Sequence, residues 1–362
     1  MFKFFVLGCS LLLFNLTAFA QEKCVPLLWP TTSLLYEDVN HAQVFSVLKK
    51  QADKAMHSPS QAIEILASAG ITNITDKKLQ NSRRVMREAD QAAVLALTYR
   101  LSSNKAYLEK AREILLLWSA KNHPTGNPIN ETRLEGLIWA YDLIACQLSS
   151  AEQIQIKTWF TQLRKKKMAW HFGPATRINN HRTHQLKMVL LLDKVLGLSQ
   201  DFHDDIKSSE QHAEINLDPK TGQSYDYHNR SSLYYHQYDL QPWLEIKLIT
   251  QLNLPAIDKA YYFMQNKIRA HEINGEFKDS KAPIDALRAK GGFSYAVAGS
   301  QFDIKRAAPS ILTFYTQHCA PIAPDMLAIV RSAKPSPWLA FLQARQMLWQ
   351  ACKTGSLLNL KS

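Results

Sequence analysis

The sequence predicts an all-α fold, an (α/α) toroid or incomplete barrel made of antiparallel helix hairpins. Three observations favour it. Apolar residues recur at helical spacing over most of the 362 residues. The segments between these runs are short, so successive helices should pack antiparallel. No alternating strand pattern stands out, and the fixed-period repeat that a regular solenoid needs is missing. Because no linker rich in Pro, Gly or Ser divides the chain, one domain with a central cleft is expected.

Helical periodicity is clearest at 79–101, where Val85, Ala89 and Ala92 share one face. A turn-rich loop, NHPTGNPIN, occupies 122–130. Ser150 and Gln153 form a capping-box pattern that should open another helix. The other helices of this half are expected at about 107–118, at 131–146 and over the second part of 177–197.

In the second half of the chain, a looser segment at 272–299 interrupts the helices, because glycines and a proline gather there. Helices are expected on both sides of it, near 203–215, 231–252, 255–271, 309–317, 323–332 and 336–352.

The first residues read as a secretory signal peptide. Lys3 precedes an apolar run from Phe4 to Leu16, which is too short to span a bilayer, and an Ala-Phe-Ala site ends at Ala20. We expect residues 1–20 to be removed near Ala20, so that 21–362 form a single α/α-toroid domain. The mature protein should be periplasmic or secreted, without insertion into a membrane.

Four cysteines remain after the signal peptide, and an oxidising compartment favours disulfide bonds among them. Three pairings are open, of which Cys319 with Cys352 closes the shortest loop. The formal net charge of +12 indicates either a generally basic surface without a specific partner or a polyanionic partner, which could be a nucleic acid, an anionic membrane or an acidic polysaccharide. Dispersed basic residues and the lack of a recognised module argue against nucleic acid.

Two helix starts carry more polar and aromatic side chains than capping or packing requires. Asn179, Asn180, His181 and His184 precede a strongly apolar stretch, and one asparagine would suffice as a cap. The second start is "YDYHNRSSLYYHQYDLQPW" at 225–243, which becomes apolar after Trp243. It places Arg230, Tyr234, Tyr235, His236 and Tyr238 near one another.

These two stretches resemble those of the alginate lyase family, whose members cut mannuronate-rich polymers. An Asn-Asn-His opens one helix (179–181), and a Tyr-His-x-Tyr preceded by an arginine lies on a later one (235–238, with Arg230). Residues 82–118 and the loop HPTGNPIN at 123–130 also resemble the family. The resemblance implies a helical toroid that performs β-elimination on a polyuronate without a metal or other cofactor.

The resemblance also implies roles for four residues. Asn180 and Arg230 would neutralise the uronate carboxylate, which makes the C5 proton easier to remove. Tyr238 would act as base and then as acid when the C5 hydrogen and the C4 oxygen lie on the same side of the ring, with Arg230 lowering its pKa. His181 would act as base from the opposite side on guluronate, or help to hold the carboxylate.

A second group of residues is expected to bind substrate. The group contains the arginines of one helix, which could instead form a solvated face, and several aromatic and histidine side chains: Arg83, Arg84, Arg87, Tyr234, Tyr235, His236, His184 and Trp243. The segment 281–296 is a candidate loop over the cleft, with Arg288 or Lys290 as contacts. His181 and His184 have metal-ligand spacing, but no acidic or cysteine partner completes a site.

Arg182, Thr183 and His184 stand where many members of the family have an aromatic residue, which leaves the identity of the polymer open. Glucuronan or another polyuronate is the nearest alternative to alginate. A glycoside hydrolase on the same toroid would need two carboxylates across the scissile bond, for which Asp226 and Asp239 are the candidates. A non-catalytic polyuronate-binding protein would need the cationic groove but not Tyr238.

Overall fold

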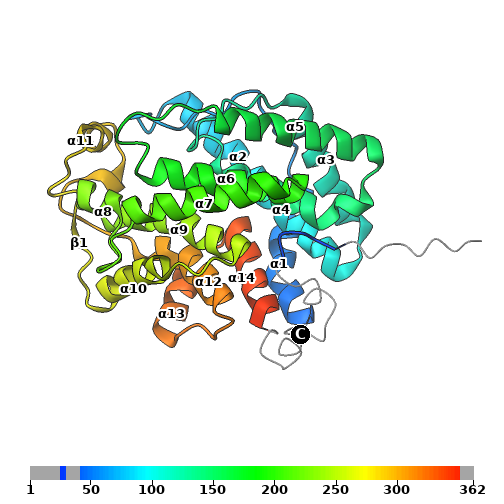
Figure 1. Cartoon of the computed structure of the whole chain (residues 1–362). Helices are drawn as coiled ribbons and strands as arrows, with labels where there is room; N and C mark the ends of the chain where they lie inside the picture. The colour runs from blue at the N-terminus through cyan, green and yellow to red at the C-terminus, as the bar shows by residue number, and fades with distance from the viewer. Residues whose placement is uncertain (1–24, 30–40, 351–362) are drawn as a thin grey trace, which may run out of the picture.

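The computed structural model describes residues 25–29 and 41–350, and these residues form a predominantly helical body, as the sequence predicts (Figure 1). The predicted signal peptide lies outside the described residues, as do Cys24 and Cys352. Cys146 is part of a disulfide bond. Which of the three pairings forms therefore stays open.

The first part of the chain forms seven long helices, several of them joined by short turns. The 3-10 turns Thr132–Leu134 and Ala145–Gln147 flank the fourth helix. The helices are α1 (His41–Met56), α2 (Lys77–Ser102), α3 (Lys105–Lys121), α4 (Glu135–Ile144), α5 (Ser150–Met168), α6 (Asn180–Leu196) and α7 (Ser199–Asn216).

The second part contains further helices and, within the described residues, two short strands. The strands β1 (Asn274–Glu276) and β2 (Ser300–Gln301) pair antiparallel. Turns of 3-10 helix occupy Ser294–Ala296 and Ile304–Ala307. The helices are α8 (Tyr225–Arg230), α9 (Leu233–Thr250), α10 (Pro255–Arg269), α11 (Pro283–Lys290), α12 (Ala308–Gln317), α13 (Pro324–Ser332) and α14 (Pro337–Gln350).

Two local predictions are wrong. The capping box that opens α5 is formed by Ser149 and Glu152, one residue earlier than predicted from the sequence. The stretch 225–243 does not form one helix start, because Ser231 adopts a left-handed conformation with φ of 46°. Arg230 therefore ends α8, whereas Tyr238 lies on α9, and the two side chains come from separately oriented helices.

The helices pack mainly on their neighbours in the chain, with closure between distant segments. Helix α2 packs against α1, α3 and α4, and α6 packs against α5, α7 and α9. The late helix α14 packs on both α1 and α2, which joins the two ends of the described chain (Figure 1). No helix within residues 25–29 and 41–350 combines the length and apolar character needed to cross a bilayer.

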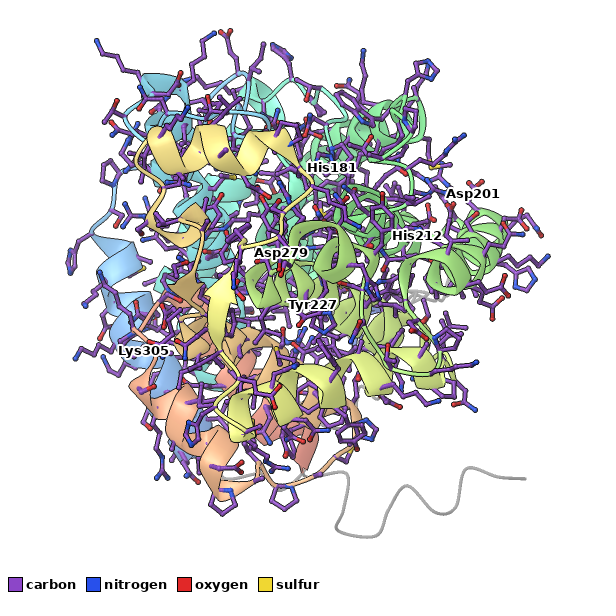
Figure 2. All side chains as sticks on the ribbon, turned by 90° about the vertical axis from the view of Figure 1, so that its left-hand side faces the viewer. His181, Asp201, His212, Tyr227, Asp279 and Lys305 are labelled. Atoms are coloured by element: carbon purple, nitrogen blue, oxygen red, sulfur yellow. The ribbon has the colours of Figure 1, made fainter. Side chains whose placement is uncertain are left out.

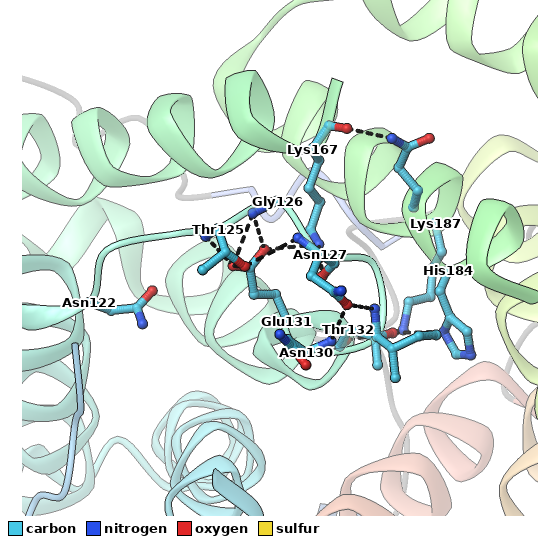
Figure 3. A network of polar contacts seen from close by, with 12 residues as sticks. Asn122, Thr125, Gly126, Asn127, Asn130, Glu131, Thr132, Lys167, His184 and Lys187 are labelled. Atoms are coloured by element: carbon cyan, nitrogen blue, oxygen red, sulfur yellow. Dashed lines mark hydrogen bonds and ion pairs between the residues drawn. The ribbon is translucent and has the colours of Figure 1, made fainter. Parts of the chain in front are cut away.

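Two buried lysine–carboxylate pairs fix the loop between α3 and α4. Lys167 lies 3.2 Å from Glu131, and Lys187 lies 2.5 Å from Glu135. Glu131 also accepts hydrogen bonds from the backbone N–H groups of Thr125 and Gly126 (Figure 3). Buried charges are tolerated only when paired and hydrogen-bonded in this way. The loop that leads into Thr132 is consequently held from α5 and α6.

Helices α2 and α4 approach so closely that Gly136 has no room for a side chain. A Cβ atom at this position would lie 2.3 Å from the carbonyl oxygen of Ala89. Since both atoms belong to packed helix backbones, an added methyl group can be accommodated only by moving the helices apart.

We predict that Gly136→Ala lowers the free energy of unfolding by about 1–3 kcal/mol, because it overpacks this contact. Urea unfolding measures the change. Gly173→Ala is the matched control, since its Cβ would meet only Thr176 Oγ1 at 3.8 Å, and it should change stability by no more than about 0.5 kcal/mol. Equal stability of the two variants would contradict the close approach.

Candidate active site

Both unusual stretches of the sequence open onto one cavity of about 550 Å³. The cavity lies between the start of α6, the short helix α8, the start of α9 and the helix α11. Figure 2 views the end of the molecule that carries α11, with His181 labelled at this end. Of the residues predicted to act in catalysis, Asn180, His181, Arg230 and Tyr238 all line the cavity, together with Arg83, Tyr234 and Tyr235.

The two asparagines have different structural roles. Asn179 is the N-cap of α6, and its Oδ1 accepts the backbone N–H of His181 at 3.0 Å. Asn180 donates its backbone N–H to Asp226 Oδ2 at 2.7 Å and its side-chain Nδ2 to Asp226 Oδ1 at 2.9 Å. Asn180 is thus held in place by a carboxylate of α8, whereas helix capping accounts only for Asn179.

Arg230 is held in a similar way from α11. Its Nε and Nη2 donate to the two carboxylate oxygens of Asp285 at 3.0 and 2.5 Å. Its guanidinium carbon lies 3.4 Å from the centroid of the Tyr235 ring, close enough for a cation–π contact. Bidentate pairing and stacking leave this arginine a single orientation at the wall of the cavity.

Tyr238 lies in a cluster of aromatic rings, 6.5 Å from the ring of Tyr234 and 4.5 Å from that of His184. Burial raises the pKa of Tyr238 above that of an ordinary phenol, and the charges of Arg288 and Arg133 counteract this only in part. The expected lowering of this pKa by nearby cations, with Arg230 as the candidate, is wrong for the free protein, because burial outweighs the arginines.

His181 is neutral at pH 7 in the free protein. Burial, followed by the charges of Arg230 and Arg288, lowers its pKa to about 4. A neutral imidazole has one nitrogen that accepts and one that donates. His181 can therefore accept a proton or donate a hydrogen bond to a carboxylate, without carrying a positive charge of its own.

A second hollow, of about 650 Å³, adjoins the first and is rich in arginine. The two hollows share Tyr234 and Tyr295, whose rings stack at 4.2 Å, and Arg306 lies over Tyr234 at 4.9 Å. The arginines that line this second hollow are Arg83, Arg84, Arg87, Arg133 and Arg306. The predicted arginine helix face, on α2, therefore forms one wall of a cationic groove.

Three predicted substrate contacts are buried and do not line either hollow. His236 is held by Ser224 and by the carbonyl of Ala260, and Trp243 donates to Asn216 within the core. His184 lies beneath Tyr238, with 4% of its surface exposed. The prediction that these three side chains contact the substrate directly is wrong. Helices α6 and α9 are buried on several sides, so their periodicity does not show which side faces the cavity.

Other side chains of the site were not predicted. Asp226 and Asp285 position Asn180 and Arg230, whereas the sequence suggested Asp226 only as a hydrolase acid. Asp239, the other hydrolase candidate, is buried beside Thr183 Oγ1 at 2.6 Å and lines neither hollow. No sequence pattern marked Arg133 or Arg306 as a groove residue, since each occurs singly in a turn.

Lys290 is exposed and lies outside the lining of both hollows, whereas Arg288 reaches the Tyr235 hydroxyl. The part of the chain that the structure describes holds no cluster of three or more His, Cys, Asp or Glu side chains suited to a metal ion.

A family model described as "Alginate lyase" matches residues 40–260, which is more than half of the chain and includes the cavity residues of α6, α8 and α9. The chain belongs to the alginate lyase family. It is therefore a polysaccharide lyase that acts on a polyuronate. No curated protein matches the chain by sequence.

Solved structures with the same fold include three alginate lyase structures. Alginate lyase A1-III from Sphingomonas species A1 is 11% identical with a TM-score of 0.57, covering 90% of this chain and 98% of its own. A variant of A1-III complexed with a tetrasaccharide is 11% identical with a TM-score of 0.56, covering 86% and 95%. An alginate lyase from Bacteroides ovatus is 15% identical with a TM-score of 0.53, covering 83% and 93%. The predicted (α/α) toroid is thereby confirmed.

We predict that the pKa of His181 rises when Arg288 is replaced by glutamine, because one of the charges that disfavour the protonated ring is removed. An NMR titration of the wild-type protein should give a midpoint of about 4 for His181. His212, whose pKa burial and the charge of Arg182 lower to about 3, is the internal control and should not respond. A wild-type midpoint near the ordinary value of about 6.5 would contradict the burial described.

Proposed function

We propose that this lyase cleaves mannuronate-rich alginate, and that Tyr238 carries out both proton transfers of the elimination. The observation that carries the proposal is the common cavity: Tyr238, Asn180 and Arg230 line it together, although they come from three helices. A basic groove adjoins it, as an anionic polymer requires. The complex of a related alginate lyase with a tetrasaccharide supports a polysaccharide substrate.

The first requirement of the reaction is to neutralise the uronate carboxylate. Asn180 Nδ2 carries two hydrogens, of which Asp226 takes one, so the other can bind a substrate oxygen. Arg230 has five N–H bonds, and Asp285 occupies two of its three nitrogens. Because both donors are already oriented, little reorganisation accompanies the build-up of charge at the carboxylate.

The second requirement is the movement of one proton from C5 to the departing oxygen. The Tyr238 hydroxyl first releases its proton to solvent. The resulting phenolate takes the C5 proton, the electron pair forms the C4–C5 double bond, and the C4–O4 bond breaks. The Tyr238 hydroxyl then returns the proton to O4, which regenerates the phenolate. One group suffices when both bonds lie on the same side of the ring, as in mannuronate and glucuronate.

The arginines around Tyr238 favour a phenolate, although burial outweighs them in the free protein. Burial raises the pKa of Tyr238, which disfavours the reactive form, whereas Arg288 and Arg133 stabilise a negative oxygen. Neutral His181 serves as a further carboxylate donor in this scheme. On guluronate, where the leaving group lies on the opposite side, His181 would instead be the base.

We also propose that the protein acts after export, in the periplasm or outside the cell. The basic and apolar residues before Ala20 support this location. The surrounding polymer is the expected partner, and no nucleic acid, cofactor or metal enters the scheme. A glucuronan lyase differs only in the sugar's C2 configuration and is tested by the same assay.

We predict that Tyr238→Phe lowers turnover at least about a hundredfold, because proton transfer by a positioned side chain contributes roughly 10²–10⁴-fold. The ring and its stacking are kept, so the affinity for polyuronate should change little. Turnover is followed by the near-ultraviolet absorbance of the unsaturated product, which a hydrolase would not form.

Tyr234→Phe is the matched control, since the ring of Tyr234 stacks on Tyr295 and contacts Arg306, and it should cost much less. Wild-type turnover in Tyr238→Phe would contradict the assignment. Strong polymer binding without an unsaturated product in the wild-type protein would indicate a binding protein instead.

A further inference from the structure

The helix that carries Tyr238 contains a proline one turn further on. Pro242 lies inside α9, four residues after Tyr238. In an α-helix the carbonyl of residue i accepts the N–H of residue i+4, and proline has no N–H. The backbone carbonyl of Tyr238 is therefore deprived of its intrahelical donor at the catalytic residue itself. A buried carbonyl in this situation requires a donor from elsewhere.

His184 of α6 is the polar side chain that meets this position. It is 4% exposed, and its ring centroid lies 4.5 Å from that of Tyr238. Its Nδ1 lies 2.8 Å from Thr132 Oγ1. Its Nε2 is buried without a partner of standard hydrogen-bond geometry among the described residues. The backbone of Tyr238 is close enough to act on the ring as a hydrogen-bonding group.

Resting on the proposed function, we infer that His184 is a positioning residue for Tyr238. Its Nε2–H donates to the Tyr238 carbonyl that Pro242 leaves free, while the Thr132 hydroxyl donates to Nδ1. The unpaired Nε2 and the unpaired carbonyl satisfy one another. The hydrogen bond is loosely aligned in the free protein and tightens when the substrate is bound, as bonds in unoccupied active sites commonly do.

The protonation state of His184 follows from its surroundings. Burial, followed by the charge of Lys187, lowers the pKa of His184 well below that of an ordinary histidine, so the ring is neutral at pH 7. A neutral imidazole has one N–H. A carbonyl can only accept, so the hydrogen belongs on Nε2 and Nδ1 must be the acceptor of the Thr132 hydroxyl.

Thr132 is itself held firmly, which gives His184 a fixed reference point. Lys187 Nζ donates to the Thr132 carbonyl at 3.3 Å (Figure 3). The same Nζ also donates to Glu135 at 2.5 Å. Thr132 follows Glu131, which is anchored by Lys167. The buried lysine pairs thus hold Thr132, and Thr132 orients His184. His184 in turn fixes the position of Tyr238 in the cavity.

The test is a double-mutant cycle between His184 and Pro242. His184→Leu removes the donor, and His184→Gln returns an N–H near the position of Nε2. In the Pro242→Ala background, residue 242 has its own N–H and can close the helical bond to Tyr238. kcat, KM and the melting temperature are measured for each variant on the same polyuronate.

With Pro242 present, His184→Leu should lower kcat by about tenfold or more with little change in KM, because small displacements of a catalytic group cost up to about 10²-fold. His184→Gln should recover most of this loss. Relative to Pro242→Ala alone, His184→Leu should lower kcat less than about threefold, since coupled residues are not additive. The same fold loss in both backgrounds, or no recovery with glutamine, would overturn the inference.

A measurement without activity separates this inference from the proposed function. ¹⁵N chemical shifts, assigned to His184 by their loss in His184→Gln, should show the Nε2–H tautomer, and the Nδ1–H tautomer would overturn the inference. Wild-type turnover in Tyr238→Phe would instead remove the proposed function. If Tyr238→Phe is inactive but the losses in the His184–Pro242 cycle are additive, only the positioning role of His184 is contradicted.

Discussion

Two carboxylate contacts tie the short helix α8 to α6 and to α11. The positions of the other side chains in the site depend on these two contacts. Asp226, at its start, accepts both N–H groups that Asn180 directs at it, and Arg230, at its end, forms a bidentate pair with Asp285 of α11. A carboxylate at the N-terminus of α6 is also favoured by the helix dipole. Six residues of α8 thereby fix the first donor of α6 and the wall formed by α11.

These contacts explain how a site for an anionic polymer remains well ordered. Because Arg230 is paired with Asp285, it acts on the substrate mainly as an oriented hydrogen-bond donor. The positive electrostatic potential of the groove comes mainly from exposed arginines further along it, such as Arg83 and Arg87. Tyr238 and His181 are neutral at pH 7 in the free protein, because burial moves their pKa values away from neutrality in opposite directions. Substrate binding then brings the negative charge to donors that are already in place.

Periodicity predicted the helices well because most carry one apolar face. The two motifs, Asn179 to His181 and Tyr235 to Tyr238, also indicated the site, because their residue types exceed what caps and packing need. The sequence did not show that His236 and Trp243 lie in the core, since α9 is buried around most of its circumference and no single face stands out.

Contacts between segments far apart in the chain also could not be predicted from the sequence. Nothing local links Asp285 to Arg230, or Thr132 to His184, because each pair is separated by more than 50 residues. The break at Ser231 depends on a left-handed backbone conformation that serine adopts only under tertiary constraint. Pro242 was visible in the sequence, yet its effect on Tyr238 becomes clear only when His184 is seen beside that carbonyl.

In the proposed reaction, one tyrosine moves the proton along a single side of the sugar ring. Initial rates of unsaturated product on purified polymannuronate and polyguluronate blocks, at equal uronate concentration, test it most directly. We expect cleavage of the mannuronate blocks to be at least about tenfold faster, since only their C5 hydrogen and C4 oxygen share the side that Tyr238 can reach. Faster cleavage of guluronate would contradict it, because the base and the acid would then have to lie on opposite sides of the ring.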